Sequence, residues 1–266
     1  MKTRLISAFV VIALAIPIFL IGSNVFKIAF YIIAMLGMKE YLDVREKKKE
    51  FPIFIKLIAY ICLTLIFFTF NIKSDMSIGT DIRYITSLLL VMFLPMILYK
   101  DKNEYNINDA CYVIGGVLLI SITMLLMVVY RNIGLSTILL LFIITVLTDT
   151  FAYVTGMLIG KHKLLESISP NKTWEGFIGG SLVATFVSVV FYITVIDGTI
   201  SIPLITFLVL FLSVIGQLGD LFFSAIKRYY KVKDFSNIMP GHGGVLDRLD
   251  SIMFVTLAYS LIIALI

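Results

Sequence analysis

Charged residues are scarce in this chain of 266 residues, since Asp, Glu, Lys and Arg make up only 15% of it. Ordinary soluble domains carry about 25% charged residues, so the composition argues against a soluble fold. The two cysteines, Cys62 and Cys111, both lie in apolar runs and indicate neither a disulfide framework nor a metal site. No linker rich in Gly, Ser or Pro divides the chain, and no internal repeat supports an inverted-repeat transporter.

Hydrophobic residues make up 60% of the chain, and the mean hydropathy is +1.03. A helix that crosses a bilayer needs about 20 apolar residues, so we expect an all-α, polytopic integral membrane protein. The net charge of +5 fits basic cytoplasmic loops and does not indicate nucleic-acid binding. Apolar runs predict about nine transmembrane helices, near residues 5–23, 25–43, 52–71, 83–99, 108–130, 134–159, 176–196, 200–226 and 247–266.

The basic residues predict how these spans are oriented. With nine spans, 18 of the 22 Lys and Arg residues fall on the side of the N-terminal tail. Basic loops remain in the cytoplasm, so we expect a multi-pass protein of the cell membrane with a cytoplasmic N-terminus. The other side receives Lys27, Lys73, Arg83 and Arg131.

Polar residues follow one stripe of the predicted span 200–226 and its cytoplasmic end. Their spacing of three to four residues puts them on one helical face, with Asp220 about 10 Å deeper than Lys227. Such a stripe is expected to face a wet cavity or the bundle interior, although polar residues also join packed helices structurally. Its members are Ser213, Gln217, Asp220, Ser224, Lys227, Arg228 and Lys231.

The last predicted span begins with two acids, Asp247 and Asp250, that share a helical face with Ser251. They suit the start of a helix, so simple capping is one interpretation. The alternative is a site for Mg²⁺ and phosphate, because carboxylates bind the ion while lysines and arginines bind the anion. Glycines surround His242 in the preceding loop and would let the backbone approach a ligand closely.

A further acid, Asp149, lies inside the predicted span 134–159. An ionisable residue in a span is a functional candidate, because leaving it unpaired in hydrocarbon is costly. Its helical face also carries Thr145, Thr148, Tyr153, Gly156 and Gly160. The two glycines have an alternative role as a close contact between helices.

Three segments resemble the phosphatidate cytidylyltransferase (CDP-diacylglycerol synthase) family. The stretch SAIKRYYKVKDFSNIMPGHGGVLDRLD, residues 224–250, is similar to the family signature at more than a dozen positions. DTFAYVTGMLIGKHKL, which begins at Asp149, and SPNKTWEGFIGG, which begins at Ser169, resemble two other family segments. Met157, Asn171 and Met239 depart from the usual residues, and none of them is an expected carboxylate ligand.

The resemblance implies transfer of the cytidylyl group of CTP to phosphatidate, giving CDP-diacylglycerol and pyrophosphate in phospholipid biosynthesis. It implies Mg²⁺ bound by Asp220 and Asp247, with K⁺ as a candidate second cation. The implied catalytic residues are Asp220, Asp247, Asp250, Lys227, Arg228 and His242, the last either in catalysis or as a brace for its loop. The implied substrate-binding residues are Asp149, Tyr153, Lys161, Lys172, Thr173, Ser224, Lys233, Asp234, Gly243, Gly244 and Arg248.

We further expect residues 1–106 to support a catalytic region at 107–266, with the active site facing the cytoplasm. The expected partners are CTP, phosphatidate and the lipid bilayer, with a homodimer as a candidate assembly. A transporter for an anionic solute is the first rival, but the polar cluster is confined to the cytoplasmic half of the spans. A CDP-alcohol phosphatidyltransferase is the second, but its Asp-Gly-x-x-Ala-Arg stretch is missing from the sequence. A non-catalytic scaffold would leave the buried acids without a purpose.

Overall fold

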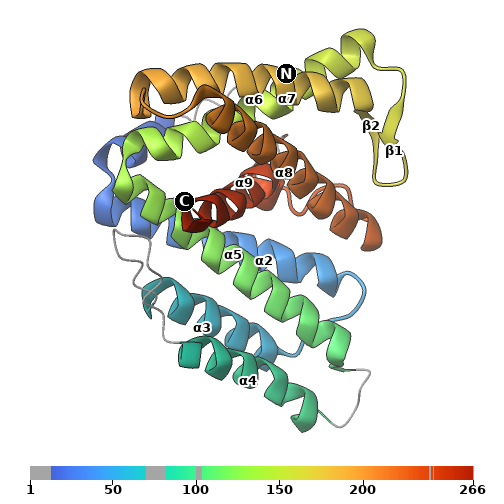
Figure 1. The fold of residues 1–266 in the computed structure, drawn as a ribbon. Coiled ribbons are helices and arrows are strands. Elements are labelled where there is room, and N and C mark those ends of the chain that lie inside the picture. The colour runs from blue at the N-terminus through green and yellow to red at the C-terminus, as the bar shows by residue number, and fades with distance from the viewer. Residues whose placement is uncertain (1–12, 70–81, 100–103, 240, 242, 266) are drawn as a thin grey trace. The chain divides into compact units, whose positions relative to one another are not determined.

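The computed structural model describes residues 13–69, 82–99, 104–239, 241 and 243–265, and these residues are mostly helical (Figure 1). The helices are α2 Ser23–Glu46, α3 Ile53–Thr69, α4 Ile82–Leu98, α5 Ile107–Ile133, α6 Leu135–Ile159, α7 Trp174–Phe191, α8 Ile202–Tyr229 and α9 Leu246–Leu265. A π-helical turn, η1 Tyr192–Ile196, extends α7. Helices suit these apolar runs because they satisfy their own backbone hydrogen bonds in hydrocarbon.

These bounds agree with eight of the predicted spans to within a few residues, and the chain is an all-α membrane protein. Among the residues that the structure describes, four helical segments are long and apolar enough to cross a membrane: α5, α6, α7 with η1, and α8. Apolar helices of 10–17 residues occupy Ile53–Thr69 and Thr86–Leu98. The first predicted span lies partly outside the described residues, of which 13–21 are helical. The count of nine spans therefore stays a prediction.

The chain forms two compact units, each of which is described by itself. Unit 1 comprises Met1–Val129 and Asp234–Leu246, and unit 2 comprises Tyr130–Lys233 and Asp247–Ile266. These units describe packing, so the predicted division into supporting and catalytic regions near residue 106 stays a prediction about function.

In unit 1, α2 and α5 pack closely through an aromatic pair and an ion pair. The rings of Tyr41 and Tyr112 stack with their centroids 4.2 Å apart, and Gly116 leaves room for the Tyr41 ring. The buried side chains of Arg45 and Asp109 form an ion pair. Asp109 thus has a structural partner near the start of α5.

In unit 2, glycines allow two pairs of helices to approach closely. A Cβ atom on Gly180 of α7 would lie 2.6 Å from the Thr148 carbonyl oxygen of α6. A Cβ on Gly219 of α8 would lie 2.7 Å from the Phe254 side chain of α9. These close contacts hold α6 against α7 and α8 against α9.

A short antiparallel hairpin connects α6 to α7 (Figure 1). Its strands are β1 Lys163–Leu165 and β2 Ser169–Thr173, and Lys163 lies opposite Thr173. Thr173 is also the N-cap of α7, where its hydroxyl accepts a hydrogen bond from the Gly176 amide at 3.1 Å. The hairpin thereby determines where Lys172 enters the unit.

Candidate active site

The deep half of the α8 polar stripe forms a structural seam. The Ser213 hydroxyl lies 2.7 Å from the Thr148 hydroxyl of α6. The Gln217 amide donates to the Ser181 hydroxyl at 2.8 Å and to the Phe177 carbonyl at 3.0 Å, both on α7. The structural interpretation of the stripe therefore holds for this half, because neighbouring helices satisfy its polar groups.

Asp220 lies one turn beyond Gln217 toward the C-terminal end of α8, and its surroundings are charged, unlike those of Gln217. Its carboxylate oxygens contact the Lys172 ammonium at 2.6 Å and accept a hydrogen bond from the Ser224 hydroxyl at 3.2 Å. Asp149 of α6 and Asp250 of α9 also interact with it electrostatically. Charged side chains from α6, α8, α9 and the hairpin thus interact around Asp220.

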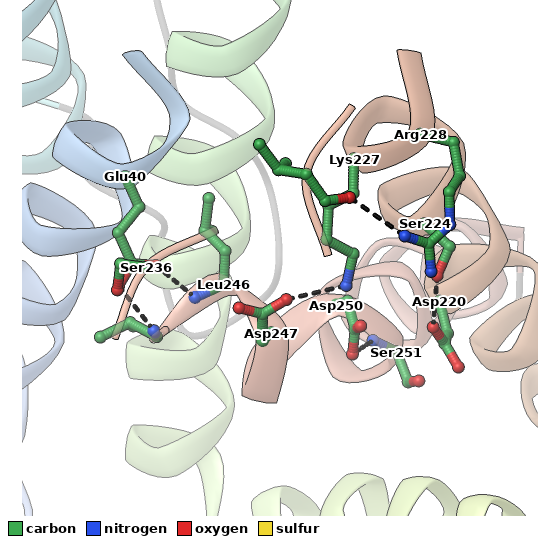
Figure 2. Close-up of polar contacts among 12 residues, drawn as sticks. Glu40, Asp220, Ser224, Lys227, Arg228, Ser236, Leu246, Asp247, Asp250 and Ser251 are labelled. Carbon is green, nitrogen blue, oxygen red and sulfur yellow. Dashed lines mark hydrogen bonds and ion pairs between the residues drawn. The ribbon is translucent and has the colours of Figure 1, made fainter. Parts of the chain in front are cut away.

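A second ion pair joins α8 to α9 (Figure 2). The Lys227 ammonium lies 2.7 Å from an Asp247 carboxylate oxygen, and the two side chains are only 9% and 6% exposed. Lys227 also interacts electrostatically with Asp250. The two helices that flank the loop before α9 are therefore neighbours.

Ser251 connects two of the remaining acids. Its hydroxyl donates to Asp149 at 3.4 Å, and its amide donates to the Asp250 carboxylate at 2.8 Å. We call the whole set the carboxylate–lysine cluster, and all its members belong to unit 2: Asp149, Lys172, Asp220, Lys227, Asp247 and Asp250.

Several other predicted residues have local structural partners or are exposed. Arg228 donates to the carbonyl oxygens of Ile168 and Val232, both at 3.1 Å, so it fastens the hairpin to the end of α8. Tyr153 is 70% exposed. Four charged residues are also exposed, namely Lys161, Lys233, Asp234 and Arg248, and their substrate contacts stay predictions.

The loop before α9 contains the predicted glycines. Gly243 adopts a φ of 82°, which favours glycine, and its carbonyl accepts a hydrogen bond from the Met239 amide at 3.0 Å. Gly243 and Gly244 are both buried. His242 lies outside the described residues, so its role stays a prediction.

The donor set of the cluster fits Mg²⁺ only if substrate completes the shell. Among the described residues, no group of three or more His, Cys, Asp or Glu side chains is arranged to hold a metal ion. Mg²⁺ commonly binds one or two carboxylates and takes its other ligands from phosphates and water. The family resemblance implies that Asp220 and Asp247 are these carboxylates, and each of them faces a lysine ammonium in the structure.

Sequence reasoning missed one buried acid, Glu40 of α2. It is 1% exposed, and its carboxylate accepts hydrogen bonds from Ser236, Val245 and Leu246 of the loop before α9. Its position inside the predicted span 25–43 was a signal in the sequence, because an acid within a span is a functional candidate. Its partners were not predictable, because Ser236 lies 196 positions further along the chain.

Comparison with known proteins extends the similarity beyond the three motif segments. The profile of the cytidylyltransferase family matches residues 2–266. A phosphatidate cytidylyltransferase of Staphylococcus haemolyticus is 36% identical over 256 residues, which cover 96% of each chain. Proteins of the same name from Staphylococcus saprophyticus and Staphylococcus aureus are 35% and 36% identical, again over 96% of each chain.

Proposed function

The chain belongs to the cytidylyltransferase family, and we propose that it transfers the cytidylyl group of CTP to phosphatidate. The products are CDP-diacylglycerol and pyrophosphate. The observation that carries the proposal is the carboxylate–lysine cluster, which gathers four acids and two lysines from apolar helices and the hairpin of unit 2.

The reaction requires neutralisation of charge more than it requires a protein nucleophile. A phosphate oxygen of phosphatidate attacks the α-phosphorus of CTP, and the bond to the β-phosphate breaks as pyrophosphate leaves. That oxygen is already anionic near neutral pH. Alignment and electrostatic stabilisation therefore account for most of the catalysis in this class of reaction.

The lysines are suited to holding the phosphates. Lys172 and Lys227 neutralise Asp220 and Asp247 in the free protein, and each can exchange a carboxylate partner for a phosphate oxygen when substrate enters. Exposed Lys161, Lys233 and Arg248 add positive charge near the ends of α6, α8 and α9. Such groups attract and orient polyanions.

Mg²⁺ is part of this proposal. Asp220 and Asp247 would hold the ion, with Asp149 and Asp250 as neighbouring acids. When bound, Mg²⁺ would offset the negative charge of the CTP phosphates and of the leaving pyrophosphate. The support is the chemistry of the donor set, because carboxylate oxygens are the protein ligands that this ion prefers.

The membrane setting matches the two substrates. The acyl chains of phosphatidate remain in the bilayer, whereas CTP is soluble in water. A charged cluster near the C-terminal end of α8 would meet both at the membrane surface. Because the loops at that end are basic, we propose that the site faces the cytoplasm.

The experiment uses purified protein with phosphatidate, Mg²⁺ and CTP labelled radioactively at one phosphate. Label at the α-phosphate should enter a chloroform-soluble lipid, whereas label at the γ-phosphate should stay in water as pyrophosphate. Chelation of Mg²⁺ should stop the transfer, and its return should restore it. Lipid labelled from the γ-phosphate would indicate a kinase instead, and the absence of labelled lipid in both samples would refute the proposal. The same assay with dCTP, ATP and UTP measures how the base is selected.

A further inference from the structure

Glu40 is a buried carboxylate outside the carboxylate–lysine cluster, and it belongs to unit 1. It accepts hydrogen bonds from the Ser236 hydroxyl at 2.5 Å and from the Val245 and Leu246 amides at 2.8 Å (Figure 2). The three donors lie at the two ends of the segment 236–246. One side chain of α2 therefore holds both ends of this loop.

The two amides have a special place in the chain, because Leu246 is the first residue of α9. The first amides of a helix have no carbonyl partner within the helix, and they form the positive end of its dipole. A carboxylate that accepts from them satisfies these donors and interacts favourably with the dipole. Glu40 thus caps α9 from a different helix, where a residue of the loop itself would ordinarily do so.

Gly244 packs against the same carboxylate. A Cβ atom on Gly244 would lie 2.6 Å from Oε1 and 2.7 Å from Oε2 of Glu40. A side chain at this position would force either the loop or the carboxylate to move. The absence of a side chain at Gly244 therefore leaves room for the Glu40 carboxylate, independently of any contact with a ligand.

We propose that Glu40 is a positioning residue that fixes the start of α9 and so the backbone of Asp247, the residue that follows Leu246. This inference rests on the proposed function, since Asp247 is a member of the carboxylate–lysine cluster. Glu40 itself touches neither substrate nor reacting atoms in this account. Its contribution is to keep the beginning of α9 in one conformation.

The first test measures amide hydrogen exchange in the peptide that contains Val245 and Leu246. In Glu40→Gln, an amide NH₂ replaces one acceptor and faces a backbone N–H donor. Exchange of these amides should accelerate by about tenfold or more, as expected for loss of one charge-assisted hydrogen bond. Glu46→Gln is the matched control on the same helix, because Glu46 contacts Phe51 and Lys56. Ser236→Ala removes one donor, keeps the carboxylate and should give a smaller acceleration in the same peptide.

The second test is a double-mutant cycle on cytidylyl transfer. Glu40→Asp withdraws the carboxylate by one methylene, and Gly244→Ala fills the space beside it. Each change alone should lower the transfer rate. The double variant should be at least as active as Gly244→Ala alone, because the shorter acid makes room for the methyl group. A general loss of stability would not produce this rescue, since contacts that are independent add their costs.

Unchanged exchange at Val245 and Leu246 in Glu40→Gln would overturn the inference. If the amides of Glu40→Gln exchange faster but its rate of cytidylyl transfer is undiminished, the positioning role is overturned. If the wild-type protein transfers no cytidylyl group, the proposed function fails. Hydrogen exchange would still report whether Glu40 fixes the start of α9.

Discussion

At the residue scale, Lys172 and Lys227 explain how several acids coexist between apolar helices. Lys172 pairs with Asp220 and also interacts with Asp149, while Lys227 pairs with Asp247 and interacts with Asp250. A buried ion pair is costly to desolvate, and removing one partner leaves an uncompensated charge. Lys227, whose pair with Asp247 is buried, is thus required for stability, apart from the catalytic role that we propose for both lysines.

Replacing Lys227 tests this dual role. Lys227→Met should destabilise the protein by about 3–5 kcal/mol, because it leaves the Asp247 carboxylate buried without its cation. The double variant Lys227→Met with Asp247→Leu should recover much of that stability, since an apolar pair suits the site. Cytidylyl transfer should stay lost in both variants. The measurements are denaturant unfolding in detergent and the transfer assay.

Recovered transfer in the double variant would contradict the catalytic role of the pair. A double variant as unstable as the single one would contradict the explanation by charge burial.

The burial of polar residues could be predicted from the sequence where the signal lay within one helix. The stripe from Ser213 to Lys227 follows the helical period, so its burial on the interior of unit 2 could be predicted. Its division into a structural seam at Gln217 and a charged end at Asp220 could not be predicted, because the partners lie on other helices. The partners of Glu40 could not be predicted either, because they lie in and beside a loop 196 to 206 positions further along the chain.

At the element scale, the contact between α8 and α9 depends on small residues. Gly216 approaches Val255, and Gly219 approaches Phe254 and the Asp250 carbonyl oxygen. This proximity lets Lys227 of one helix reach Asp247 of the other. The relative position of these helices therefore determines the geometry of the acids.

Gly219→Ala should disturb this contact. A methyl group would lie 2.7 Å from Phe254 and 2.9 Å from the Asp250 carbonyl, so the helices must move apart. Overpacking of this kind costs about 1–3 kcal/mol, and transfer should fall with it. Gly115→Ala is the matched control, because no atom lies within 4 Å of a Cβ built there. Alanine in that helix should be neutral or stabilise it by up to about 1 kcal/mol.

Thermal unfolding in detergent, measured beside the transfer rate, compares the two variants. Equal unfolding temperatures and equal transfer rates for Gly219→Ala and Gly115→Ala would contradict the assigned role of the α8–α9 contact.

Helices could be predicted from the sequence and the hairpin could not. Apolar runs long enough to span a bilayer leave the backbone few alternatives to a helix. The strands Lys163–Leu165 and Ser169–Thr173 have only three and five residues, too few to give the alternating sequence pattern that identifies a half-buried strand. The hairpin nevertheless brings Lys172 to Asp220.

At the scale of the whole molecule, the distribution of basic residues predicts the sidedness of the site. The hairpin and the C-terminal end of α8 should face the cytoplasm, and the loop before α8 should face outward. The proposed use of cytosolic CTP requires this orientation.

Single cysteines introduced into a chain without Cys62 and Cys111 test the orientation. Glu166→Cys lies between the strands of the hairpin, and Ser201→Cys lies at the N-cap of α8; both positions are exposed. A maleimide that cannot cross membranes should label position 201 in intact cells. It should label position 166 only after the membrane is opened. The reverse pattern would place the cluster on the wrong side for CTP.

The transfer rate of Asp220→Asn, compared with that of Asp197→Asn, tests most directly whether the Asp220 carboxylate takes part in catalysis. Asp197 lies in the loop before α8 and accepts hydrogen bonds only from Thr199 among the contacts described, so it is a carboxylate remote from the cluster. We expect Asp220→Asn to fold but to lose about a hundredfold or more of its transfer activity, as expected for removal of a preorganised charge. Asp197→Asn should retain wild-type transfer. Wild-type activity in a correctly folded Asp220→Asn protein would contradict the claim that this carboxylate is part of the catalytic machinery.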